Sequence, residues 1–215
     1  SRSYGDGSLS PDGQKLAMTL RAANDDIWVY QLNRGTLTRI TFGGGNSDFP
    51  VWTPDGKRVV YVSERGKTVK LFSKPWDGSG SEEKIGESVN LDFVSWEAVS
   101  PDGKFVAFGQ GGDIWMLPFA PNSKPEKIIA SPAAEINPAF SPDGHWLSYI
   151  SNESGQNEVY VVPFPRGDGK YQISTKGATY SRWQPDGKTL IYLSGRQVME
   201  VDVRLSPAFD FSPPR

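Results

Sequence analysis

Few residues in this chain could carry out catalysis. It has a single histidine, His145, and no cysteine. His145 directly follows a Pro-Asp-Gly sequence, at a position where other repeats of the chain have Gln14, Lys57, Lys104 and Lys188, so we expect a solvent-facing side chain. A Ser-His-Asp triad needs a histidine beside its serine, and no Gly-x-Ser-x-Gly segment occurs. We therefore predict no catalytic residues and no enzymatic activity.

Carboxylates are the remaining groups that could support chemistry. Asp48, Asp92, Glu97 and Glu135 could hold a metal ion if the fold brought them together, which would suit a hydrolase or a lyase. We keep this enzyme as an alternative function. The acidic stretch from Asp77 to Glu82 has oxygen ligands at alternate positions, but its glycines and serines favour a turn. We predict no bound metal and no cofactor.

The residues that must position these groups are organised by a repeated turn. Five copies of x-Pro-Asp-Gly occur, with their prolines at Pro11, Pro54, Pro101, Pro142 and Pro185, which are 43, 47, 41 and 43 residues apart. Proline presets the second position of a type I turn, aspartate tolerates the third, and glycine adopts the left-handed conformation that follows. Such a sequence predicts a tight hairpin in each repeat, with its glycine at positive φ.

Each turn is followed by short runs rich in β-branched and aromatic residues, without a sustained helical period. The runs directly after the turns are Lys15 to Leu20, Arg58 to Ser63, Phe105 to Phe108, Trp146 to Ser151 and Thr189 to Ser194. Two further runs complete each unit, which therefore predicts four antiparallel strands. A repeat of about 40–45 residues built of short strands is typical of a β-propeller blade. We predict an all-β propeller of five four-stranded blades, either a closed ring or an arc of a larger propeller.

The repeats are continuous, so we predict one domain over residues 1–215. Its repeats cover approximately residues 1–45, 46–91, 92–133, 134–176 and 177–215. The net charge is −2, from 23 basic and 25 acidic residues, and 37% of the residues are hydrophobic. This balance gives no electrostatic basis for binding nucleic acid, and no apolar stretch is long enough to span a membrane. If the ring is open, we expect self-association through the uncovered blade faces.

The repeat resembles that of the TolB-like, WD-like β-propellers of bacteria. The resemblance rests on Pro138 to Gly144, Tyr149 to Gly155 and Glu158 to Val161, and on Asp26 to Tyr30 running on to Phe42. The last stretch is especially similar to the extracytoplasmic propellers joined to bacterial serine/threonine kinases. The resemblance implies a periplasmic or extracytoplasmic location and a role as an interaction platform.

In propellers the loops that precede the innermost strands gather on one face around the axis. Polar and aromatic residues in these loops are suited to binding a peptide or a small polar ligand. The candidate ligand-binding residues are Asp48, Trp96, Glu97, Asn137, Tyr180 and Arg182. We expect a non-catalytic scaffold that binds a protein, a peptide or a small polar ligand through this face, and that could be the sensor domain of a larger envelope protein. A purely structural or assembly module is the second alternative.

Overall fold

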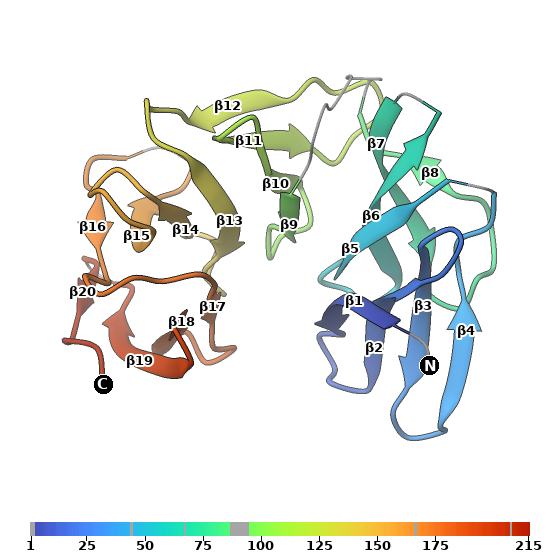
Figure 1. Ribbon diagram of the computed structural model, residues 1–215, viewed down its shortest axis with the longest axis horizontal. Helices are drawn as coiled ribbons and strands as arrows, with labels where there is room; N and C mark the ends of the chain where they lie inside the picture. Colours follow the sequence, from blue (N-terminus) through green and yellow to red (C-terminus); the bar gives the residue numbers. More distant parts are fainter. Residues whose placement is uncertain (1–2, 44, 67, 87–94, 166, 207) are drawn as a thin grey trace.

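A computed structural model shows an all-β protein built of five four-stranded antiparallel sheets. The structure describes residues 3–43, 45–66, 68–86, 95–165, 167–206 and 208–215, without the side chains of residues 95–97. Figure 1 shows the sheets around one axis in chain order, like the blades of a propeller. In this part of the chain no helix is long and apolar enough to cross a membrane.

Each sheet keeps its strands in sequence order, from the axis outward. The first blade consists of β1 (Ser3–Leu9), β2 (Lys15–Arg21), β3 (Asp26–Gln31) and β4 (Thr36–Arg39). The second consists of β5 (Ser47–Trp52), β6 (Arg58–Arg65), β7 (Thr68–Pro75) and β8 (Glu83–Lys84). The third consists of β9 (Ser95–Val99), β10 (Phe105–Gln110), β11 (Asp113–Pro118) and β12 (Glu126–Ile129). The fourth consists of β13 (Glu135–Phe140), β14 (Trp146–Ser151), β15 (Glu158–Pro163) and β16 (Tyr171–Gln172). The fifth consists of β17 (Ser181–Trp183), β18 (Thr189–Ser194), β19 (Gln197–Arg204) and β20 (Asp210–Phe211).

The five Pro-Asp-Gly turns are equivalent hairpins between the first and second strands of the blades, as predicted. Their glycines have φ values of 68° (Gly13), 66° (Gly56), 71° (Gly103), 73° (Gly144) and 68° (Gly187). In each turn the glycine N–H donates to the carbonyl of the residue before the proline, for example Gly103 to Ser100 at 2.8 Å. Glycine is required here because the left-handed conformation is costly for residues that have a Cβ.

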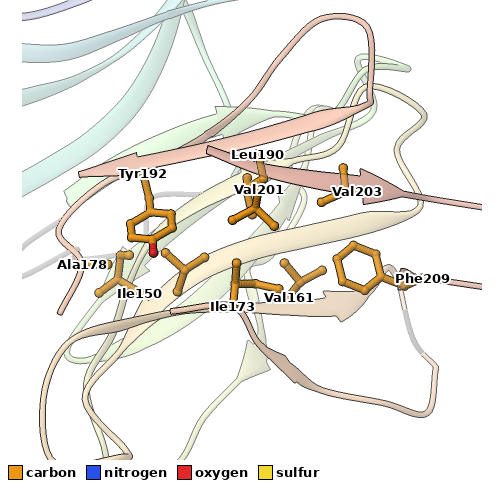
Figure 2. Close-up of a cluster of buried hydrophobic side chains, with 10 residues drawn as sticks. Ile150, Val161, Ile173, Ala178, Leu190, Tyr192, Val201, Val203 and Phe209 are labelled. Atoms are coloured by element: carbon orange, nitrogen blue, oxygen red, sulfur yellow. The ribbon is translucent and has the colours of Figure 1, made fainter. Parts of the chain in front are cut away.

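The core consists of separate hydrophobic clusters, each of which fills the seam between two consecutive blades. Figure 2 shows the cluster between the fourth and fifth blades, where Ile150, Val161 and Ile173 face Leu190 and Val201. Stacking is necessary because a single sheet cannot bury both of its faces. Among the described residues, four such clusters join the five blades in chain order, and none of them joins the fifth blade to the first.

The residue two positions before each turn proline packs against the preceding blade where one covers it, and the tryptophans at this position also donate a hydrogen bond to that blade. Trp52 is 6% exposed, and its Nε1 donates to the Ser8 carbonyl of the preceding blade at 2.9 Å. Trp183 makes the same bond to Ala139 of the fourth blade at 3.1 Å. Leu9 is the equivalent residue of the first blade and is 56% exposed. The first blade therefore has one face that no other described blade covers.

Candidate functional site

A cavity of about 560 Å³ lies at the axis, and all five innermost strands contribute to its wall. These strands are the inner edges of their sheets (Figure 1). Four aromatic rings line the cavity, those of Phe49, Trp52, Phe140 and Trp183. Five prolines line it as well: Pro11, Pro50, Pro54, Pro101 and Pro138. The wall therefore combines rigid aromatic and proline side chains with polar surface of nearly equal extent.

β-bulges determine which side chains reach the cavity. The register of β5 shifts between Asp48 and Val51, and that of β13 shifts between Ile136 and Ala139. Within these bulges Phe49 has a φ of 55° and Asn137 a φ of 56°. Positive φ is uncommon for residues other than glycine, and a bulge re-aims the side chains around it. Both bulges lie five residues before a turn proline, so they belong to the repeat.

Prolines on these edge strands restrict how a ligand could bind. Pro50 and Pro138 occupy equivalent positions, four residues before the turn proline, and both line the cavity. A proline has no N–H to donate to an added strand, and prolines protect sheet edges for this reason. The wall therefore favours side-chain contacts over strand addition.

Among the described residues, two charged side chains line the cavity, Arg182 and Asp6. Arg182 lies on β17, and its side chain is exposed to the solvent in the cavity. The surrounding protein lowers the pKa of Arg182 by desolvation, but a guanidinium remains cationic at physiological pH. Its one hydrogen bond among the described residues is from Nη1 to the carbonyl of Ser181, at 2.9 Å.

Asp6 lies on β1. Burial raises its pKa, the nearby Asp48 carboxylate raises it further, and Arg21 lowers it. Asp48 itself accepts a hydrogen bond from the Thr19 hydroxyl at 2.6 Å and lies 3.7 Å from Arg21. Asp48 is therefore engaged with the first blade rather than open to the cavity.

The other candidate binding residues occupy different surroundings. Asn137 is 3% exposed, its Nδ2 donates to the Thr179 carbonyl at 2.9 Å, and its Oδ1 is buried without a described partner. Tyr180 is 38% exposed and precedes β17. Trp96 and Glu97 lie on β9 by their backbone, while their side chains lie outside the described residues. Of the six candidates, Arg182 lines the cavity directly.

Asp6 and the aromatic and proline residues of the wall were not among the candidates predicted from the sequence. Three of the prolines are the turn prolines themselves, and the other wall residues lie two to five positions before a turn proline, so the repeat alignment is the signal that could have found them. The bulges turn part of this segment toward the axis.

Among the carboxylates considered for a metal site, the structure describes the side chains of Asp48 and Glu135, which have different partners. Glu135 accepts a hydrogen bond from Ser131, in the loop between β12 and β13, whereas Asp48 accepts one from Thr19 of the first blade. Asp92 lies outside the described residues. Where the structure is described, no group of three or more His, Cys, Asp or Glu side chains is arranged to hold a metal ion. His145 is exposed, and its backbone N–H donates to Asp143 at 3.1 Å as part of the turn.

Comparisons with known proteins agree with this architecture. An uncharacterized peptidase, YuxL of Bacillus subtilis, is 26% identical and matches 73% of this chain and 32% of its own length. The Tol-Pal system protein TolB of Helicobacter hepaticus is 22% identical and matches 72% of this chain and 38% of its own length. The chain thus spans about a third of the length of these relatives.

The crystal structure of TolB from Acinetobacter baumannii superimposes with a TM-score of 0.76 at 19% identity, and covers 100% of this chain and 55% of that one. At this identity the similarity concerns the fold alone. The TolB beta propeller domain family matches residues 3–117, which is more than half of the chain. On the strength of that match, the chain belongs to the TolB beta propeller domain family.

Proposed function

We propose that this domain is a non-catalytic binding scaffold that takes a peptide segment of a partner protein, or a small polar ligand, at the propeller axis. The observation that carries the proposal is the axial cavity. Its volume of about 560 Å³ lies within the range of ligand pockets, about 300–1,000 Å³. Because every blade contributes to the wall, one ligand can contact all five repeats.

The chemistry of the wall suggests what it would bind. The rings of Phe49, Trp52 and Phe140 and the prolines beside them suit an apolar side chain, and rigid rings lose little entropy on binding. Arg182 suits an anionic group because a guanidinium binds a carboxylate through two parallel hydrogen bonds. We therefore infer a ligand that combines an apolar group with a carboxylate.

The remaining candidates complete the proposed site around this centre. Asn137 and Asp48 adjoin the lining residues Pro138 and Phe49 along the chain. Trp96, Glu97 and Tyr180 stand close before the turns of the third and fifth blades. We propose that these residues contact the part of a ligand that extends beyond the cavity.

We propose an extracytoplasmic location and a role as the sensor or interaction domain of a larger protein. The support comes from relatives named as TolB of the Tol-Pal system and from the similarity to kinase-linked propellers. The Bacillus subtilis relative is named as a peptidase, but the matched region is 32% of that protein. We assign no catalytic step to this domain, and metal analysis of the purified protein tests the alternative of a metal-dependent hydrolase or lyase.

The experiment is panning of a phage-displayed random peptide library on the purified protein, followed by affinity measurement by fluorescence anisotropy. We expect enrichment of peptides with aromatic and acidic residues. Arg182→Gln should weaken their binding at least about tenfold, which is about 1.4 kcal/mol. The control is Arg204→Gln, since Arg204 pairs with the exposed Asp210 at 2.9 Å on the outer strands and does not line the cavity. Equal affinities for the wild type and Arg182→Gln, or no enriched peptides, would refute the proposal.

A further inference from the structure

A second cavity lies in the seam between the third and fourth blades and shares no lining residue with the axial cavity. It has a volume of about 380 Å³, and the end of β12 and the loop after it form one wall. Four polar residues line it from the fourth blade: Glu135, Tyr149, Glu153 and Lys170. We call this cavity the Glu135 pocket.

Glu135 is a buried acid with an unsatisfied oxygen. Its side chain is 1% exposed, its Oε1 accepts a hydrogen bond from the Ser131 hydroxyl, and its Oε2 is buried without a partner among the described residues. The second and fifth repeats have the buried neutral residues Ser47 and Ala178 at this position, seven before the turn proline. Burying a carboxylate oxygen without a partner destabilises a fold. The acid is thus specific to one repeat and is not needed to build a blade.

In the second repeat, the tyrosine equivalent to Tyr149 has a hydrogen-bond acceptor. Tyr61, seven residues after the turn proline, donates its hydroxyl hydrogen bond to Glu82, and Arg65 Nη2 pairs with Glu82 at 2.6 Å. The neighbouring hollow, which Ser47, Ser63 and Arg65 help to line, has no room for a water molecule. The Tyr61 hydroxyl and the ion pair are thus satisfied within the protein.

In the fourth repeat the ion pair has the opposite sign. Strand register places Lys170 where the second repeat has Glu82, and Glu153 takes the place of Arg65. The pair is kept, with Lys170 Nζ 2.6 Å from Glu153 Oε2. Lysine cannot accept a hydrogen bond, and the equivalent Tyr149 hydroxyl has no acceptor among the residues that the structure describes. Among the described residues, the Tyr149 hydroxyl and Glu135 Oε2 therefore lack hydrogen-bond partners.

From this geometry we propose that the Glu135 pocket binds an organic cation, an ammonium or guanidinium group on an alkyl stem. Among the described lining residues, Glu135 and Glu153 are two acidic side chains against one basic side chain, Lys170. Glu135 Oε2 and the Tyr149 hydroxyl offer acceptors, and proximity to both carboxylates contributes to the raised pKa of Tyr149, after its burial. Apolar walls that include Ile128, Val162 and Pro163 suit the methylene stem of a lysine or arginine.

A cation already lies against one ring of this region. Lys170 Nζ is 5.5 Å from the centre of the Tyr160 ring, which occupies the position of Phe72 in the second repeat. The Tyr160 ring holds this lysine and does not itself line the pocket. The carboxylates that line the pocket attract positive charge and repel an anion. The pocket therefore has the opposite charge preference to Arg182 in the axial cavity.

The test is a two-dimensional NMR titration of the protein with three probes. These are agmatine, the peptide acetyl-Gly-Arg-Gly-amide and the neutral control acetyl-Gly-Gln-Gly-amide. We expect both cations to shift the backbone signals of Glu135, Tyr149 and Glu153 with saturation, and the neutral peptide to shift none of them. Tighter binding of the peptide than of agmatine indicates a polypeptide ligand, and equal binding indicates that the cationic group alone is recognised.

Three variants decide the interpretation. Glu135→Gln keeps the shape of the side chain and should weaken cation binding at least fivefold, while Glu82→Gln, its counterpart in the second repeat, should leave binding unchanged. Arg166 lies outside the described residues, between the lining residues Pro165 and Gly167. If the cations bind Arg166→Ala but not the wild type, the chain's own arginine is the occupant and the proposal is wrong. It is also wrong if neither protein binds, or if Glu135→Gln raises the melting temperature without changing binding.

Discussion

The aspartates of the Pro-Asp-Gly turns act as local acceptors. The Thr53 hydroxyl donates to Asp55 Oδ1 at 2.7 Å, and the N–H of Lys57 donates to the same oxygen at 3.0 Å. These two hydrogen bonds, the hydroxyl first, lower the pKa of Asp55. The bond from Ser100 lowers the pKa of Asp102 in the same way. These aspartates therefore stabilise the turns. Their carboxylates accept hydrogen bonds from the turn itself, although an exposed acidic residue could also have bound a metal ion or a partner.

These shifts predict how stability depends on pH. A carboxyl whose pKa is lower in the folded state contributes stability above its unfolded value of about 3.9, and this contribution is lost as the pH falls through the folded value. We expect the urea midpoint of the wild type to fall between pH 5 and pH 3. Asp55→Asn should be less stable than the wild type at pH 7, and the difference should shrink at pH 3. An equal difference at both pH values would contradict this role of Asp55.

At the scale of the blade, the seam is the element that stabilises the molecule. Trp52→Ala removes a ring that is 6% exposed and a hydrogen bond to the preceding blade, so we expect a loss of about 3–5 kcal/mol in the free energy of unfolding. Leu9→Ala alters the same repeat position where it is 56% exposed, and should cost less than about 1 kcal/mol. Urea denaturation of both variants measures the difference. Similar losses would mean that Leu9 is covered in solution.

Much of this architecture could be predicted from the sequence, since the five turns set the repeat and the glycines fix its hairpins. The residues that line the axial cavity could not be predicted in this way. Alternation along a strand predicts which face of the sheet a side chain lies on, and a β-bulge shifts that alternation by one residue. Phe49 is the clearest example, since a phenylalanine does not favour the positive φ that it adopts here. Glu135 is a second example. It was considered with Asp48 as a metal ligand, but it lines the seam between the third and fourth blades, whereas Asp48 contacts the first blade.

The whole molecule is a series of blades joined by seams in chain order. Among the described residues no hydrophobic cluster covers the outer faces of the first and fifth blades, where Tyr4 is 66% and Val198 62% exposed. Exposed apolar faces promote association. We expect the average mass measured by light scattering to rise with protein concentration, and Leu9→Ser to reduce the increase. A constant monomer mass would show that these faces do not associate.

The central claim is that ligands bind at the axis, and the tryptophans allow a direct measurement. Of the seven tryptophans, Trp52 and Trp183 line the axial cavity, whereas Trp76 and Trp115 do not. With 5-fluorotryptophan-labelled protein, each assigned by a Trp→Phe variant, a panned peptide should shift the ¹⁹F signals of Trp52 and Trp183 and leave those of Trp76 and Trp115 in place. Shifts confined to Trp76 or Trp115, with Trp52 and Trp183 unchanged, would contradict binding at the axis.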